Sequence, residues 1–174
     1  MQDIYQKARP IRLAIFDVDG VLTDGGLFYS DSGEETKVFD VRDGHGMKML
    51  EKSGVALAII TSRRSQCVAR RAENLGIELL FQGVENKLQA FESLSAKLGF
   101  SHAQCAYMGD DWVDLPVLGR CGLALSVPEA PAVVRERVHY VTRAGGGRGA
   151  VREACELIMN AQGTFEAQLA PFLS

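Results

Sequence analysis

The chain has 174 residues, of which 47% are hydrophobic and 24% charged, as in ordinary globular proteins. This length suits one domain with one substantial core, and the lack of low-complexity tracts excludes a disordered or fibrous protein. A net charge of -3 does not supply the basic field that nucleic-acid binding needs. We therefore expect a single domain over residues 1–174 with no nucleic-acid partner.

Short apolar runs alternate with longer amphipathic stretches, which predicts β-α units and a three-layer, Rossmann-like α/β fold around a mostly parallel sheet. The predicted strands are Leu13–Phe16, Val55–Ile60, Leu79–Phe81, Cys105–Met108, Leu123–Val127 and Tyr140–Val141. The predicted helices are Gly46–Ser53, Ser65–Leu75, Lys87–Leu98, Val113–Leu118, Ala132–Glu136 and Gly149–Asn160. The C-terminal tail, about residues 161–174, is expected to form a short helix or a mobile end.

One segment interrupts this alternation. Leu27–Tyr29 and Thr36–Phe39 flank the polar stretch Ser30–Glu35, a pattern that predicts a β-hairpin. The hairpin, about residues 25–40, would be an insertion between the first strand and its helix. We expect its apolar side chains to pack against a partner surface: Leu27, Phe28, Val38 and Phe39.

The cysteines and the N-terminal segment bear on location. Residues 1–12 mix acids and bases without an apolar run, and no segment approaches the ~18 consecutive apolar residues of a membrane span. We therefore predict a cytoplasmic protein with no membrane partner. Four widely spaced cysteines form no C-x-x-C pair, so we predict buried thiols: Cys67, Cys105, Cys121 and Cys155.

Polar clusters follow three of the predicted strands. They are Asp17-Val18-Asp19-Gly20, Thr61-Ser62-Arg63 and Gly109-Asp110-Asp111. The carboxyl ends of parallel strands meet at one edge of a sheet, where ligands bind, so these clusters should converge. Gathered carboxylates repel one another and need a cation, and an all-oxygen site with room for water suits Mg²⁺.

The same residue types suit phosphoryl transfer. Asp17 can attack phosphorus, and Asp19, two residues later, can reach the leaving oxygen as a general acid. Thr61 can donate a hydrogen bond to a phosphoryl oxygen, while Lys87 supplies a positive charge. A lone D-x-D-G is weak because Asp and Gly are common in turns. The prediction depends on the ordered combination of D-V-D-G-V-L-T-D, a strand-terminal Thr, a later Lys and G-D-D-x-x-D.

These residues resemble the four motifs of the haloacid dehalogenase (HAD) superfamily: 17–24, Thr61, Lys87 and 109–114. Over almost its full length the chain is similar to a capless subfamily of sugar-acid phosphatases, with the best local matches at 41–44, 82–87, 140–143 and 145–153. The resemblance implies Asp17 as nucleophile and Asp19 as general acid/base. It also implies Mg²⁺ held by the Asp17 carboxylate, the Asp19 backbone carbonyl and Asp110.

The resemblance further implies a substrate and an assembly. The substrate would be 3-deoxy-D-manno-octulosonate 8-phosphate, hydrolysed through an aspartyl phosphate in a step toward lipopolysaccharide. The assembly would be a homotetramer built through the hairpins, with segments of a neighbour closing each site. Arg63, Arg71 and Arg148 are candidates for binding the substrate carboxylate, because an Arg fork matches a carboxylate.

Three alternatives remain open from the sequence. The enzyme could act on another nonulosonate or sugar phosphate, or the chain could be a phospho-receiver module or a catalytically silent regulator. Receivers, however, place their acid pair and phosphorylated Asp on different strands, whereas Asp17 and Asp19 follow one strand. The segment Gly145–Gly149 could cradle a phosphate or act as a flexible hinge, and it lacks the P-loop pattern.

Overall fold

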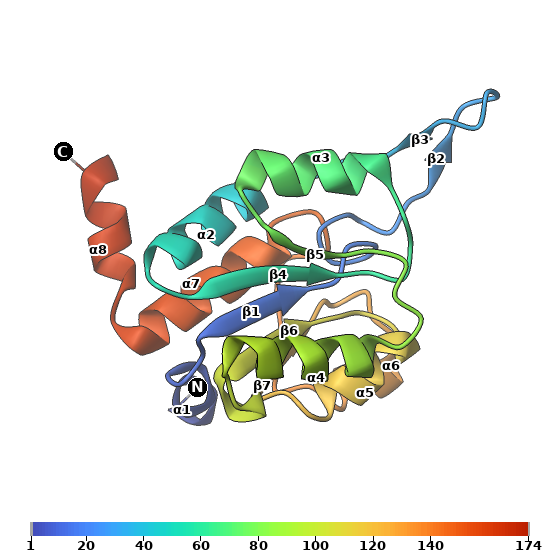
Figure 1. Cartoon of the computed structure of the whole chain (residues 1–174). Helices are drawn as coiled ribbons and strands as arrows, with labels where there is room; N and C mark the ends of the chain where they lie inside the picture. Colours follow the sequence, from blue (N-terminus) through green and yellow to red (C-terminus); the bar gives the residue numbers. More distant parts are fainter. Residues whose placement is uncertain (1, 174) are drawn as a thin grey trace.

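The structure, a computed structural model, describes residues 2–173. Its main sheet has six strands in the order β5-β4-β1-β6-β7-β8, and every neighbouring pair is parallel (Figure 1). The strands are β1 Leu13–Phe16, β4 Ala56–Ile60, β5 Leu79–Phe81, β6 Cys105–Met108, β7 Leu123–Ser126 and β8 Tyr140–Val141. All six predicted strands are therefore confirmed, with bounds that shift by at most one residue.

Helices cover both faces of the sheet. Figure 1 shows α2, α3 and α7 on one face and α4, α5 and α6 on the other, so the three-layer prediction is confirmed. The α-helices are α1 Gln2–Ala8, α2 Val41–Lys52, α3 Gln66–Leu75, α4 Lys87–Leu98, α5 Leu115–Leu118, α6 Ala132–Arg135, α7 Ala150–Gln162 and α8 Phe165–Leu169. Three short 3-10 helices are η1 His102–Gln104, η2 Trp112–Asp114 and η3 Ala170–Phe172.

Two helices differ from the sequence prediction by more than two residues. Helix α1 was not predicted, because its pattern is too short to identify, yet Ala8 is fully buried. Helix α2 begins at Val41, whereas the prediction began at Gly46. Asp40 caps it by accepting the Arg42 N–H at 2.7 Å. Glycine lowers helix propensity, but here it permits close packing, since a Cβ on Gly46 would lie 3.0 Å from the Cα of Arg152 on α7.

The predicted hairpin is present. Strands β2 Phe28–Tyr29 and β3 Glu35–Thr36 pair antiparallel and project from the body of the molecule (Figure 1). Leu27, Phe28 and Val38 are exposed, as expected. Phe39 corrects the prediction: it is half-buried against the core, and the Arg71 guanidinium lies 5.8 Å from its ring centre.

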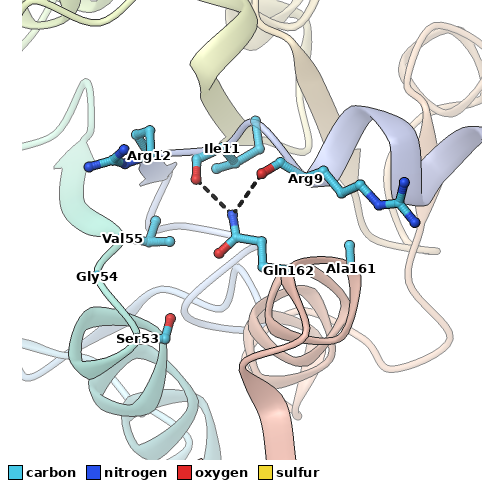
Figure 2. A pocket seen from close by; sticks show the side chains of 8 residues that line it. All are labelled: Arg9, Ile11, Arg12, Ser53, Gly54, Val55, Ala161 and Gln162. Atoms are coloured by element: carbon cyan, nitrogen blue, oxygen red, sulfur yellow. Dashed lines mark hydrogen bonds between the residues drawn. The ribbon is translucent and has the colours of Figure 1, made fainter.

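At the amino-terminal edge of the sheet, Gln162 of α7 contacts the segment before β1. There the Gln162 amide donates to the carbonyl of Ile11 at 2.7 Å and borders a cavity of about 530 Å³ (Figure 2). This cavity lies before β1 and β4, so it is at the opposite edge from the predicted catalytic residues.

The cysteines and the helix lengths complete the comparison. All four thiols are free; Cys67 is only half-buried, while the other three are buried as predicted. Within residues 2–173, every helix is too short or too polar to cross a membrane.

Candidate active site

The strand order places the carboxyl ends of β1 and β6 at a crevice. The chain runs from β1 to β4 and β5 on one side and then resumes at β6 on the other side of β1. Ligands of open parallel sheets bind at such a switch point. Asp17 directly follows β1 and donates its N–H to the Met108 carbonyl at 3.0 Å, which extends the ladder up to the crevice. Asp110 comes two residues after β6.

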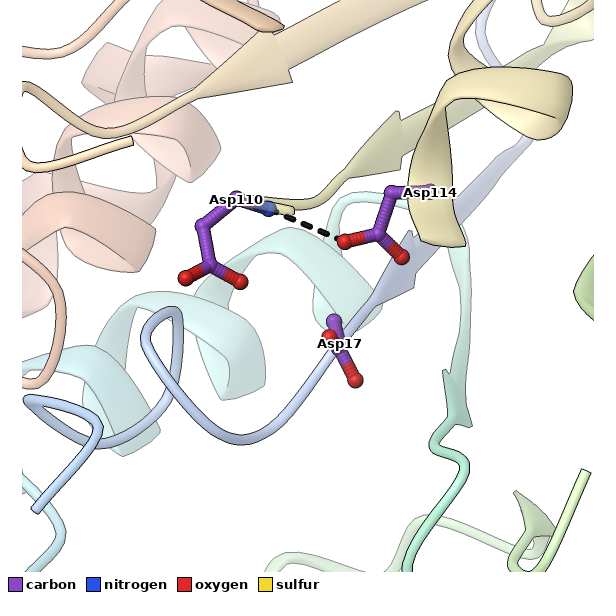
Figure 3. Close-up of side chains that lie close together, drawn as sticks. All are labelled: Asp17, Asp110 and Asp114. Carbon is purple, nitrogen blue, oxygen red and sulfur yellow. Dashed lines mark hydrogen bonds between the residues drawn. The ribbon is translucent and has the colours of Figure 1, made fainter. Parts of the chain in front are cut away.

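Three carboxylates meet at this edge. One oxygen from each of Asp17, Asp110 and Asp114 lies within 4.8 Å of the others (Figure 3). Burial, followed by the charge of Asp114, raises the pKa of Asp17 to about 6. Burial, followed by the charges of Asp17 and Asp114, raises the pKa of Asp110 to about 7. The cluster therefore resists full ionisation unless a cation is bound.

A buried lysine partly offsets this negative charge. Lys87 begins α4, and its Nζ lies 2.8 Å from an Asp17 oxygen and 2.7 Å from an Asp114 oxygen. Burial disfavours the ammonium, but the two carboxylates outweigh this effect and raise the pKa of Lys87 above its usual value. Lys87 is thus a fixed positive charge beside the Asp17 carboxylate.

Asp114 anchors the cluster through buried hydrogen bonds. It is fully buried, and the Tyr107 hydroxyl donates to it at 2.6 Å. Its second oxygen accepts the N–H groups of Asp110 and Asp111, both at 3.1 Å. The G-D-D-x-x-D motif contains Asp114, but the motif alone assigns it no role. Helix η2 turns the chain back toward the strand end, which brings Asp114 to the cluster.

Thr61 follows the neighbouring strand. Phe16 of β1 is opposite Ile59 of β4, so Asp17 and Thr61 end adjacent strands at nearly the same level. Thr61 is buried, and its hydroxyl accepts the Arg63 N–H at 3.4 Å, which leaves the hydroxyl proton available for another acceptor. The structure thus brings Thr61, like Lys87, to the edge that carries Asp17.

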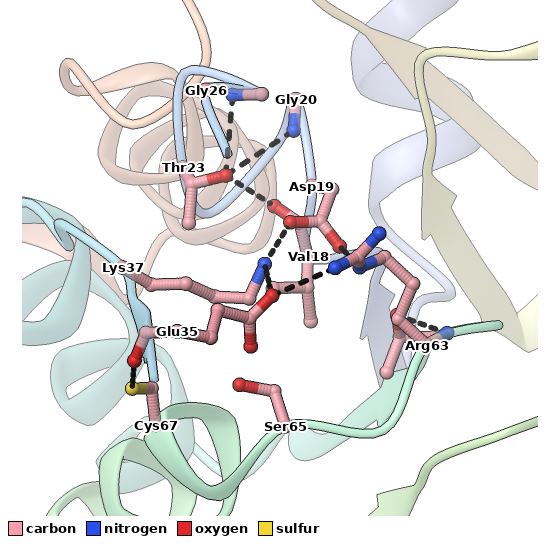
Figure 4. Close-up of polar contacts among 12 residues, drawn as sticks. Val18, Asp19, Gly20, Thr23, Gly26, Glu35, Lys37, Arg63, Ser65 and Cys67 are labelled. Atoms are coloured by element: carbon pink, nitrogen blue, oxygen red, sulfur yellow. Dashed lines mark hydrogen bonds and ion pairs between the residues drawn. The ribbon is translucent and has the colours of Figure 1, made fainter. Parts of the chain in front are cut away.

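The Asp19 carboxylate lies in a different charge network. It contacts the Lys37 ammonium through Oδ1, and Oδ2 lies 3.6 Å from Arg63 Nε (Figure 4). Glu35 bridges the two cations, at 3.4 Å from Lys37 and 2.8 Å from Arg63. Sequence reasoning missed Lys37 and Glu35, because nothing in the hairpin sequence indicates a contact with a residue so distant along the chain.

Glycines allow two loops to meet beside the carboxylates. Gly20 has φ +87°, and a Cβ there would lie 2.0 Å from an Asp110 oxygen. A Cβ on Gly146 would lie 1.9 Å from the Gly20 carbonyl oxygen, and Gly147 donates to the Val21 carbonyl at 2.9 Å. The segment that was predicted as a phosphate cradle or hinge is therefore docked against the loop after β1. Together with Asp110 it lines a cavity of about 430 Å³.

Comparison with known proteins identifies the family. No protein-family model matches the chain. The 3-deoxy-D-manno-octulosonate 8-phosphate phosphatase of Yersinia pestis is 48% identical over 164 residues, which cover 94% of this chain and 88% of that protein. The chain belongs to this phosphatase family. The HAD-like fold that the motifs predicted is confirmed, because HAD hydrolases are among the structural neighbours.

Solved structures agree over the whole length. A probable YrbI family phosphatase from Pseudomonas syringae has a TM-score of 0.98 and 52% identity, covering 100% of this chain and 99% of that one. The phosphatase of Moraxella catarrhalis, solved with a magnesium ion, a phosphate ion and a KDO molecule, has a TM-score of 0.97 and 48% identity and covers 99% of each chain.

The three arginines suggested for substrate binding have different surroundings in this family member. Arg63 lies beside Asp19, and Arg148 lines the cavity next to Asp110 and pairs with Asp24 at 3.2 Å. Arg71 instead donates to the Asp40 carbonyl at 3.1 Å and covers the Phe39 ring. The structure thus brings Arg63 and Arg148 to the sheet edge that carries Asp17 and Asp110, which we call the catalytic edge. It directs Arg71 toward the start of α2.

The carboxylate repulsion predicts an unusual stability profile. The folded-state pKa of Asp110, about 7, exceeds its ordinary value of 3.8, so this group favours the folded state less as the pH rises through that range. In chelator at pH 8, Asp110→Asn should raise the melting temperature by about 3 °C, and the gain should shrink toward pH 5. Thermal melts of this variant, wild type and the exposed-site control Asp31→Asn measure the effect; equal melting of all three at pH 8 would contradict it.

Proposed function

We propose that this chain hydrolyses 3-deoxy-D-manno-octulosonate 8-phosphate to the free sugar acid and inorganic phosphate. The observation that supports this substrate is the similarity to the Moraxella catarrhalis phosphatase, whose structure holds KDO, phosphate and magnesium. The match covers 99% of both chains. We also propose a role in lipopolysaccharide synthesis and a cytoplasmic location.

Asp17 and Asp19 supply the covalent chemistry in this proposal. An Asp17 oxygen bonds to phosphorus, the bond from phosphorus to the sugar oxygen breaks, and the Asp19 carboxyl proton moves to that oxygen. A water oxygen then attacks the phosphorus of the aspartyl phosphate while Asp19 accepts the water proton. Breaking the bond between Asp17 and phosphorus releases phosphate and restores the carboxylate.

Lys87 and Thr61 bind the phosphoryl group in the same proposal. The Lys87 ammonium, 2.8 Å from Asp17, is placed to offset charge on phosphoryl oxygens near the nucleophile. Because Asp114 also holds Lys87, the ammonium stays in position when Asp17 becomes esterified. Thr61 offers its hydroxyl from the adjacent strand.

The residues present fit a magnesium ion. The three clustered carboxylates and Lys87 leave two negative charges when all are ionised, and the donor atoms are all oxygen, which Mg²⁺ prefers. Asp17 and Asp110, with the Asp19 carbonyl, would hold the ion, since Asp114 is already occupied by Lys87, Tyr107 and two N–H groups. The ion would supply positive charge against the phosphate oxygens.

Substrate recognition and assembly complete the proposal. Arg63 and Arg148 are placed to bind the sugar-acid carboxylate, and the surroundings of Arg71 favour it least. We propose a homotetramer in which the hairpins meet, because Phe28 and Val38 are 55% and 65% exposed on a projecting element. Segments of a neighbour would then close the site in place of a cap domain.

The first test is turnover. The purified protein should release phosphate from 3-deoxy-D-manno-octulosonate 8-phosphate faster than from a panel of other sugar phosphates, including other nonulosonate phosphates. Asp17→Asn should lower the rate at least about 1000-fold because it removes the nucleophile. The exposed-site control Asp3→Asn should keep wild-type activity. Preference for another panel member would reassign the substrate, and an Asp17→Asn rate within tenfold of wild type would reject the nucleophile.

The second test is metal removal. Exhaustive chelation should abolish phosphate release, and added Mg²⁺ should restore it, because the ionised carboxylates repel a phosphate dianion without a cation. In Asp110→Asn the same addition should restore little activity, since one of the ligands is lost. Full activity of the chelated wild type would rule out the metal requirement.

The third test concerns assembly. Phe28→Asp places a charge on the exposed apolar face of the hairpin and should shift the tetramer to smaller species, as measured by light scattering after gel filtration. Ser32→Asp adds the same charge at the exposed polar tip of the hairpin and should leave the mass unchanged. A monomeric wild type, or a Phe28→Asp variant of unchanged mass, would contradict the proposed interface.

A further inference from the structure

Lys37 is a lysine buried at the base of the hairpin. Its side chain is 1% exposed, although the segment that carries it follows the partly exposed strand β3. A buried ammonium is costly unless it is paired, and Lys37 has two partners, Asp19 and Glu35. It reaches Asp19 from a different segment, so the hairpin contacts the residue proposed as the general acid/base.

Each oxygen of the Asp19 carboxylate faces a cation. Lys37 contacts Oδ1, while Arg63 Nε faces Oδ2 at 3.6 Å, beyond hydrogen-bond distance. Lys37 is therefore the closer of the two partners. Without it, the longer ion pair to Arg63 would leave the carboxylate free to rotate, since an ion pair at this distance sets no hydrogen-bond direction.

Glu35 and Tyr29 fix the cations in turn. Glu35 accepts from Arg63 at 2.8 Å and lies 3.4 Å from Lys37 (Figure 4). The Tyr29 hydroxyl contacts the same Arg63 nitrogen at 2.5 Å. Two acids and two bases form a network without net charge. Two of these four charged groups, Glu35 and Lys37, come from the hairpin, as does Tyr29, so this element sets the geometry around Asp19.

We propose that Lys37 is a positioning residue for proton transfer, which orients the Asp19 carboxylate toward the leaving oxygen of the substrate. This inference rests on the proposed phosphatase function and on the role of Asp19 in it. Misplacing a reacting group by about 1 Å can cost about 100-fold in rate, so orientation alone gives Lys37 a measurable effect. Lys37 itself need not touch the substrate.

A leaving-group contrast tests the proposal. The parameter kcat/KM reports the steps up to departure of the leaving group, where Asp19 must protonate a sugar alkoxide but not a p-nitrophenolate. Lys37→Met should lower kcat/KM by about 100-fold for the sugar-acid phosphate and less than about threefold for p-nitrophenyl phosphate. Lys37→Arg, which keeps the charge, should recover part of the loss, and Lys52→Met, an exposed lysine of α2, should leave both substrates unaffected.

Two further measurements separate positioning from folding. If Lys37→Met does not fold by circular dichroism and thermal melting, Glu35→Gln should show the same contrast at smaller size. In an Asp19→Asn background, Lys37→Met should cause no additional loss, because both changes disable one step. Equal losses for both substrates, unchanged kinetics, or additive losses in the double variant would each overturn the proposal.

A failure of the proposed function can be distinguished from a failure of the proposed role of Lys37. If wild type does not hydrolyse 3-deoxy-D-manno-octulosonate 8-phosphate, the substrate assignment is wrong, and the contrast is then measured between the alkyl phosphate that wild type hydrolyses fastest and p-nitrophenyl phosphate. A preserved contrast would support the role of Lys37 for that substrate. Loss of the contrast with intact wild-type turnover would reject the role of Lys37 alone.

Discussion

Lys87 lies between Asp17 and Asp114 with almost no access to solvent, and the catalytic edge depends on this arrangement. Removing one partner of a buried ion pair is far more costly than forming the pair is beneficial, so loss of any one of the three groups would leave an uncompensated charge in the interior. Asp114 is the structural end of the triad, because its remaining hydrogen bonds bind the strand end and the turn that carries Asp110. Asp17 is the end at the crevice and is the proposed nucleophile.

Close backbone approach lets the other components reach this triad. Asp110 fits beside the first loop only because Gly20 has no side chain, and Gly146 fits over that loop for the same reason. Gly109 is similar, since a Cβ there would lie 2.5 Å from the Asp114 carboxyl carbon. The glycines next to the acids therefore act sterically: they bring charged groups from separate strands within reach of one ion.

The sequence predicted the sheet well because each buried strand is a short apolar run followed by polar residues, and periodicity detects such runs directly. It also located Asp17, Asp110, Thr61 and Lys87, whose positions depend on strand ends and a helix start. It placed the start of α2 at Gly46 rather than Val41, because Gly44 lowers the helix propensity of the first turn, whereas tertiary packing beside Arg71 leaves no room for a Cβ there.

The remaining misses also depend on contacts between distant segments. Lys37 becomes informative only once the hairpin has folded back onto Asp19, and Arg71 only once α3 lies near Phe39. Phe39 shows the same limit: a count of apolar residues in the hairpin cannot say which side of the segment faces the core. Local pattern gives the strand ends, whereas these contacts are set by tertiary packing.

In the hairpin, alternation of the side chains decides which residues face the core. From Glu35 to Phe39 the residues are alternately shielded and exposed: Glu35, Lys37 and Phe39 are at least partly buried, while Thr36 and Val38 are exposed. Successive side chains of an extended segment point to opposite sides, so one short stretch serves two surfaces. Its charged side chains face Asp19 and Arg63, and Val38 faces outward on the same side as Phe28. The same stretch therefore contacts Asp19 through Lys37 on its shielded side and exposes Val38 on the other.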